Sequence, residues 1–174
     1  MRWVERTADF SARSAGPDDT AVIAQAIAAV LVPGDVLVLG GDMGAGKTTF
    51  TKALGAALGI TETITSPTFT LHQQYEGGRF TLHHLDVYRI DQIEEVIDLA
   101  LPELFESGGA VVIEWGDTIA PALPAGFALL SFGFGDGDDD RHISLTAIGS
   151  AWHMRVPGLK EVLADRLIDR QDDY

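Results

Sequence analysis

The sequence predicts a single α/β domain over residues 1–174, in which a mixed central sheet is flanked by helices. Continuous apolar runs at 36–39 and 110–113 are typical of buried parallel strands. Paired strand-like segments around turns near 76–78 and 135–140 predict two antiparallel hairpins. Segments with helical spacing of apolar residues lie between these strands, which together indicate an α/β arrangement.

The first half of the chain is expected to alternate helix, strand and helix. Helix-capping residues at 18–20 predict the start of the first helix, and Pro33-Gly34 ends it. Its apolar face is formed by Val22, Ile23, Ala26, Ile27, Val30 and Leu31. The strand at 36–39, a glycine-rich segment at 40–46 and a helix over about 47–58 follow.

The second half is expected to hold the two hairpins and two further helices. Strands are predicted at 71–75 and 79–87, and a helix over 91–106 precedes the apolar run at 110–113. The second hairpin is expected from strands at 128–134 and 141–147. The last helix is predicted from an apolar stripe of Leu159, Val162, Leu163 and Leu167.

Composition excludes several classes of protein. The chain has 12 Lys and Arg against 26 Asp and Glu, a net charge of −14, so a broad basic patch for nucleic acid is not expected. It contains no Cys, which excludes disulfides, thiolate metal sites and cysteine nucleophiles. The apolar run 21–32 is too short to span a bilayer, and the first eleven residues do not resemble a signal peptide. We therefore expect a cytoplasmic protein that does not enter the membrane.

The strongest functional pattern is G-x-x-x-x-G-K-[ST] at 41–48, which predicts a P-loop NTPase-like domain. A predicted buried strand precedes it and a helix follows, as the motif requires. Its glycines let backbone N–H groups converge, and the N-terminus of the helix adds positive charge where phosphates bind. Lys47 can reach the β- and γ-phosphates in a catalytic role, and the Thr48 hydroxyl can ligate Mg²⁺. The expected nucleotide-binding residues are Gly41, Asp42, Met43, Gly44, Ala45, Gly46, Lys47, Thr48 and Thr49.

Two acidic residues are candidates for the further carboxylate that a P-loop ATPase needs. Glu114 follows the apolar run 110–113, so it is expected at the carboxyl end of a central strand, where open α/β sheets bind ligands. Asp86 would share one strand face with His84 and Tyr88. The residues leave open which acid holds the metal and which orients water. A histidine such as His84 is more often structural than a ligand or base.

The segment after the P-loop helix has two interpretations. The hydroxyls of Ser66 and Thr68, which flank Pro67 and precede Phe69, can approach the γ-phosphate or Mg²⁺ as a switch segment would. An ordinary turn is equally compatible, because Ser-Pro favours turns. Trp115, beside the candidate acid, can either pack against a base or fill the core.

Missing motifs favour ATP as the nucleotide. The chain contains no Asn, so the N-K-x-D motif that reads guanine is absent, and no D-x-x-G occurs. There is also no arginine-rich lid of the kind small-molecule kinases use. Three functions stay open from these residues: an accessory ATPase acting on a protein complex, a kinase of a small molecule or nucleotide, and a nucleotide-gated binding module.

Four sequence blocks, in this order and at these spacings, resemble the TsaE family, formerly YjeE. They are 41–49, 66–69, 84–89 and 114–115. The P-loop alone is generic, whereas the four blocks together are specific. TsaE proteins are small P-loop ATPases of bacterial tRNA threonylcarbamoyladenosine biosynthesis, and the resemblance spans about residues 35–117.

The resemblance implies a function beyond what the spacing indicates. It implies that the chain binds ATP and Mg²⁺, hydrolyses ATP slowly alone, and acts on a complex of TsaD and TsaB whose activity it resets. By matching positions, Thr48 and Glu114 would be Mg²⁺ ligands, Asp86 the second acid and 66–69 a switch-like loop. Trp115 and the segment 18–20 would then lie near the nucleotide, and the turn at 136–141 can reach the base.

Overall fold

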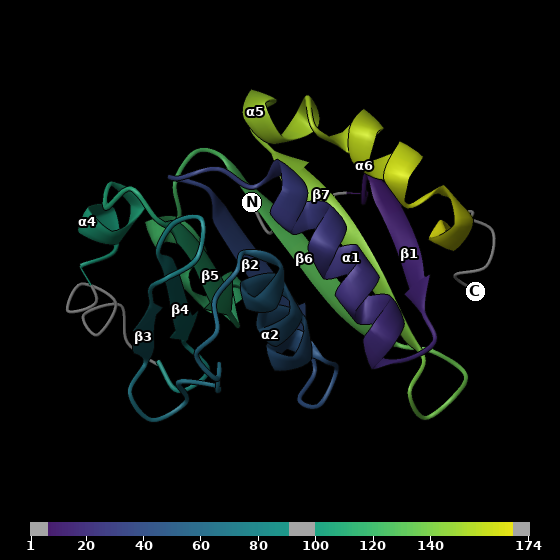
Figure 1. Ribbon diagram of the computed structural model, residues 1–174, viewed down its shortest axis with the longest axis horizontal. Coiled ribbons are helices and arrows are strands. Elements are labelled where there is room, and N and C mark those ends of the chain that lie inside the picture. Colours follow the sequence, from purple (N-terminus) through teal and green to yellow (C-terminus); the bar gives the residue numbers. More distant parts are fainter. Residues whose placement is uncertain (1–6, 91–99, 169–174) are drawn as a thin grey trace.

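A seven-stranded mixed sheet forms the centre of the protein, in the order β1-β7-β6-β2-β5-β4-β3 (Figure 1). The structure is a computed structural model that describes residues 7–90 and 100–168. Its strands are β1 (Phe10–Ser14), β2 (Val36–Gly41), β3 (His72–Tyr75), β4 (Leu82–Asp86), β5 (Ala110–Glu114), β6 (Phe127–Phe134) and β7 (Arg141–Ile148). The predicted α/β class with a mixed sheet is confirmed.

The middle of the sheet is parallel and its flanks are antiparallel. β2 pairs in parallel with both β5 and β6, and β5 pairs in parallel with β4. β3 pairs antiparallel with β4, and β7 pairs antiparallel with both β6 and β1, so both expected hairpins are present. Because β2, β4 and β5 run in the same direction, the residues that follow them meet at one edge of the sheet.

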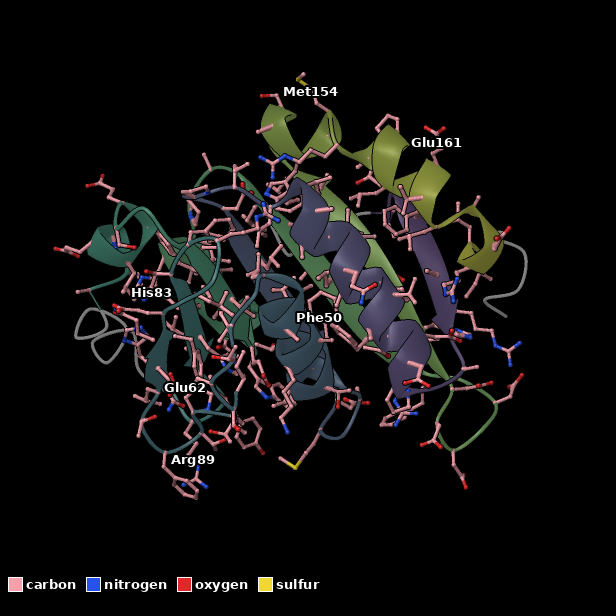
Figure 2. All side chains as sticks on the ribbon, viewed as in Figure 1. Phe50, Glu62, His83, Arg89, Met154 and Glu161 are labelled. Carbon is pink, nitrogen blue, oxygen red and sulfur yellow. The ribbon has the colours of Figure 1, made fainter. Side chains whose placement is uncertain are left out.

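Helices lie on both faces of the sheet. The described helices are α1 (Pro17–Val30), α2 (Lys47–Ala57), α4 (Leu101–Phe105), α5 (Ser150–His153) and α6 (Val156–Val162), with 3₁₀ helices η2 (Gly116–Ala122) and η3 (Ala164–Arg166). α1 and α2 lie side by side over one face (Figure 1), whereas α4 and η2 pack into the core on the other face through Leu101 and Ile119. Phe50 of α2, which is labelled in Figure 2, packs edge-on against Phe132 of β6, with ring centroids 5.6 Å apart. None of the helices over residues 7–90 and 100–168 is long and apolar enough to cross a bilayer.

Two hydrophobic cores explain the continuous apolar runs in the sequence. Leu37 and Leu39 face the core under the helices, whereas Val36 and Val38 face a second core on the other side of the sheet. The same alternation holds along β5, which is buried at every position. A strand buried on both faces shows no polar alternation, which is why its sequence reads as an unbroken apolar run.

Several boundaries differ from the sequence prediction in the first half of the chain. β1 was not expected; after Phe10 its buried positions are the small residues Ala12 and Ser14, which give a weak apolar signal. α1 begins at Pro17 with Gly16 as its N-cap and no side-chain cap, so the prediction of a start at 18–20 is wrong. Asp19 instead accepts a hydrogen bond from the Ala15 N–H group through Oδ2, at 3.0 Å.

Other differences lie in the second half of the chain. The strand expected over 79–87 is confined to 82–86. Of the helix expected over 91–106, residues 91–99 lie outside the described part of the chain, and α4 occupies only 101–105. The last helix, α6, ends at Val162, which is 70% exposed and so does not belong to the predicted stripe, whereas Leu159 and Leu163 are buried.

Candidate functional site

The P-loop connects β2 to α2 at the carboxyl edge of the sheet. Gly41, Gly44 and Gly46 have φ angles of 125°, 78° and 105°, a region that L-residues other than glycine rarely adopt. A Cβ on Gly41 would also overlap the carbonyl oxygen of Phe132 in β6. The glycines of the motif are therefore needed both for the path of the loop and for its close approach to the neighbouring strand.

Lys47, the first residue of α2, points back into the loop. Its Nζ donates to the carbonyl oxygens of Gly41 at 2.6 Å and Asp42 at 2.8 Å. Burial lowers the pKa of Lys47, and nearby carboxylates, Glu114 above all, oppose that shift. An ammonium that is partly stripped of water and surrounded by oxygen atoms interacts strongly with a bound anion.

Trp115 supplies an aromatic face to this lysine. Its ring centroid lies 3.8 Å from the Nζ atom of Lys47, within cation–π distance. The tryptophan holds a left-handed backbone conformation, with φ of 63°, and its ring packs against Tyr88 at 4.8 Å between centroids. The half-buried ring thus contacts both the cavity and the edge of the second core. Strained non-glycine residues of this kind are concentrated at functional sites.

Thr48 and Glu114 meet across the junction of α2 and β5. The Thr48 hydroxyl lies 3.0 Å from Oε1 and 3.1 Å from Oε2 of Glu114, and the glutamate is only 3% exposed. A hydroxyl and a carboxylate are the oxygen ligands that Mg²⁺ prefers, and Mg²⁺ commonly completes its shell with substrate phosphates and water. Over the described residues no group of three or more His, Asp or Glu side chains could hold a metal by itself. The donors at this junction therefore fit a nucleotide-bound Mg²⁺.

Asp86 has different partners from Glu114, although the two residues are paired in register across β4 and β5. Its Oδ2 accepts hydrogen bonds from the hydroxyls of Ser66 and Thr68, both at 2.9 Å, and its Oδ1 accepts the Tyr88 N–H group at 3.1 Å. Through these hydrogen bonds Asp86 holds the segment 66–69 against the carboxyl end of β4. The geometry separates the two acids that the sequence left undivided: Glu114 contacts the P-loop helix, and Asp86 contacts the switch-like segment.

The two remaining residues of the switch-like segment, Pro67 and Phe69, differ in exposure, since Pro67 is buried. The carbonyl of Pro67 accepts the Leu71 N–H group at 2.7 Å, and the Phe69 side chain is 83% exposed. The guanidinium of Arg89 lies 4.8 Å from the centroid of the Phe69 ring, at the lower edge of the molecule (Figure 2). Pro67 and Phe69 therefore shape the segment without lining the cavity.

A cavity of about 320 Å³ lies between these elements. Its lining residues are Met43, Gly44, Gly46, Lys47, Thr48, Thr49, Ser66, Thr68, Asp86, Tyr88, Glu114 and Trp115. Most of the predicted site residues thus line one cavity. Gly41, Asp42 and Ala45 belong to the same loop but do not line it. Tyr88 also lines the cavity, although it lies in the turn after β4 rather than on the strand face predicted for it, and the sequence did not identify it as part of the site.

Two further contacts could not be identified from the sequence. The Arg141 side chain, at the start of β7, donates to the Gly44 carbonyl at 3.3 Å, so the β6–β7 turn touches the tip of the P-loop. His84 of β4 places Nε2 at 2.8 Å from Oε1 of Glu114. Both contacts depend on which strands are neighbours in the sheet, which no local pattern specifies.

Comparison with known proteins identifies the family. The family model for "Threonylcarbamoyl adenosine biosynthesis protein TsaE" matches residues 14–143. The chain belongs to the TsaE family. The TsaE of Bacillus subtilis (strain 168) is 44% identical over 142 residues, which cover 82% of this chain and 88% of that protein. The TsaE of Treponema pallidum (strain Nichols) is 44% identical over 124 residues, covering 71% and 84%.

Solved structures agree with this assignment. The crystal structure of YdiB from Bacillus subtilis superposes with a TM-score of 0.77 at 37% identity, covering 90% of this chain and 98% of that one. This likeness confirms the fold. Membership of the TsaE family supports a role in threonylcarbamoyladenosine biosynthesis.

Proposed function

We propose that this TsaE protein is a Mg²⁺-dependent ATPase that acts on the TsaD–TsaB complex and supports its turnover in tRNA threonylcarbamoyladenosine synthesis. The observation that carries the proposal is the convergence of Lys47, Thr48 and Glu114 on one cavity beside a P-loop. The lysine is a cation for phosphate, and the threonine and glutamate are a hydroxyl and a carboxylate for Mg²⁺. Membership of the TsaE family supports the assignment to threonylcarbamoyladenosine biosynthesis.

Each residue of the site has a defined part in this proposal. The backbone N–H groups of the P-loop and the start of α2 would hold the phosphates, and Lys47 would stabilise the charge that develops on the transferred phosphoryl group. Mg²⁺, held by Thr48 and Glu114, would neutralise phosphate oxygens. Asp86 would keep the hydroxyls of the switch-like segment at the phosphate end of the cavity, in a position to orient the attacking water.

The charge of the cavity supports dependence on a partner. Among its described lining residues Lys47 is the only cation, and no arginine borders the hollow. Phosphoryl transfer in P-loop NTPases is often accelerated by an arginine that another chain supplies, by about 10³–10⁵-fold. A site with one cation is therefore expected to turn over slowly alone and faster in a complex. The same lack of arginines argues against a kinase, which needs cations to hold a second phosphorylated substrate.

The proposal is tested by measuring Mg²⁺-dependent ATP hydrolysis with and without purified TsaD and TsaB. Lys47→Ala should lower turnover by about 10²-fold or more, because it removes the cation beside the phosphoryl group. Lys52→Ala is the matched control, since Lys52 lies on the same helix but is exposed. We expect stimulation by the complex in the wild type and in the control variant.

Two outcomes would contradict the proposal. Unchanged hydrolysis in Lys47→Ala would show that the cavity is not the catalytic site. ATP binding without any stimulation by competent TsaD and TsaB would instead favour the kinase function, and transfer of the γ-phosphate to a small molecule would establish it.

A further inference from the structure

We propose that His84 is a positioning residue that holds the Glu114 carboxylate in the orientation needed to ligate Mg²⁺. The inference rests on the proposed function, in which Glu114 is a metal ligand. It starts from the contact between His84 Nε2 and Glu114 Oε1, which are 2.8 Å apart. His84 is completely buried and Glu114 is 3% exposed, so water does not compete for this hydrogen bond.

The direction of the hydrogen bond is set by chemistry. An ionised carboxylate has no proton to donate, so Nε2 of His84 must carry the hydrogen. In the neutral ring, Nδ1 then has only a lone pair. The Nδ1 atom is buried and has no hydrogen-bond partner among residues 7–90 and 100–168.

The unpartnered Nδ1 atom indicates that His84 is not there for packing. A buried polar atom without a partner destabilises a fold, whereas an apolar side chain of similar size would fill the same space without that loss. The residues that share a face with His84 are apolar: Leu82 of β4 and Val112, the register partner of His84 in β5, are both packed in the first core. A polar ring in such surroundings is best explained by what its N–H group does for Glu114.

The hydrogen bond restricts a flexible side chain. The glutamate has three rotatable bonds, and the Thr48 hydroxyl lies almost equally far from both of its oxygens, at 3.0 and 3.1 Å. That contact alone does not distinguish Oε1 from Oε2. The N–H group of His84 contacts only Oε1, so it is this hydrogen bond that distinguishes the two oxygens. Hydrogen bonds from outer residues to metal-ligating carboxylates commonly alter metal affinity by about 10–100-fold.

The chain contains a natural control in the next residue. His83 is also buried, at 4% exposure, but it points to the opposite face of β4. Its Nδ1 pairs with His72 Nε2 at 3.1 Å and its Nε2 with the Ser107 hydroxyl at 3.0 Å. Changes at His83 therefore disturb a buried histidine in the same strand without touching Glu114.

The test measures ATP affinity by calorimetry as a function of Mg²⁺ concentration and in EDTA, together with the melting temperature. His84→Leu removes the unpartnered Nδ1 atom and also the donor to the buried Glu114 carboxylate, so it should fold with a modestly lower melting temperature. The Mg²⁺ concentration for half-maximal effect should rise about 10–100-fold, with ATP affinity in EDTA unchanged. His84→Gln places an amide N–H group near the position of Nε2 and should restore the wild-type Mg²⁺ requirement to within about threefold. His83→Leu should leave the Mg²⁺ requirement unchanged.

Three results would overturn the inference. His84→Leu could keep the wild-type Mg²⁺ requirement, which would show that Glu114 needs no positioning. His83→Leu could raise the Mg²⁺ requirement by the same factor, which would show that any disturbance of β4 has this effect. His84→Leu could fail to fold, which would make the histidine a structural residue. A wild-type chain whose ATP affinity did not respond to Mg²⁺ would instead contradict the proposed function.

Discussion

Gly41, the last residue of β2, should tolerate a methyl group far less well than Gly44 in the same loop. Both residues have positive φ angles, 125° and 78°, so alanine at either position bears a conformational cost of about 1–2 kcal/mol. The surroundings differ. A Cβ on Gly44 has no atom within 4 Å, whereas a Cβ on Gly41 overlaps the Phe132 carbonyl oxygen and lies 3.2 Å from its carbonyl carbon.

The difference between the two variants isolates the steric term. Gly41 and Phe132 are paired in the β2–β6 ladder, so the overlap can be relieved only by separating two backbones. Overpacking of this kind costs about 2 kcal/mol. For a chain of this size, that difference corresponds to about 4–8 °C in melting temperature. Gly41→Ala should therefore melt about 4–8 °C below Gly44→Ala.

The assay is thermal unfolding followed by circular dichroism in EDTA without nucleotide, because a bound ligand would raise the melting temperature of whichever variant retains it. The matched variant Gly44→Ala also places an alanine at a positive φ, but without the contact with Phe132. Equal melting temperatures would refute the reasoning, since they would mean that β2 and β6 do not approach each other at Gly41.

Two further predictions concern stability. Burial is the main cause that lowers the pKa values of His72 and His83 in the folded protein. Below about pH 6.5 the unfolded chain therefore binds more protons than the folded protein, so the free energy of unfolding should fall as the pH is lowered. Melting temperatures between pH 7.5 and 5 should show this, with a smaller loss in His72→Gln, and a pH-independent melting temperature would contradict it. Arg155→Ala should cost about 2–3 kcal/mol in urea unfolding, because it removes the 2.6 Å partner of the nearly buried Asp35 carboxylate. An unchanged urea midpoint would mean that the Arg155–Asp35 pair does not contribute to the stability of the fold.

The sequence predicted correctly those features that are determined within one continuous segment of the chain. The apolar runs at 36–39 and 110–113 were recognisable because both strands are buried on two faces. The P-loop was recognisable because its glycines, lysine and threonine stand at fixed spacing in one continuous segment. The positions of Asp86 and Glu114 were predictable because each ends a strand at the same edge of the sheet.

The sequence was least informative where a feature depends on partners far along the chain. β1 has a weak apolar pattern, and it forms a strand because its backbone pairs antiparallel with β7. The contact of Arg141 with Gly44 joins residues 97 positions apart, and that of His84 with Glu114 joins residues 30 apart. The division of partners between the two acids has the same origin, since it depends on how β4, β5 and α2 meet.

The most direct test of the account counts the threonylcarbamoyladenosine formed per TsaD–TsaB complex in a reconstituted reaction. The reaction is run with ATP and either the wild-type chain or Glu114→Gln, whose amide oxygen can still accept hydrogen bonds from Thr48 and His84. We expect repeated turnover with the wild type and about one product per complex with the variant, although both bind ATP. Equal product yields from the two proteins would contradict the account, because hydrolysis at this site would then be unnecessary and nucleotide binding alone would suffice.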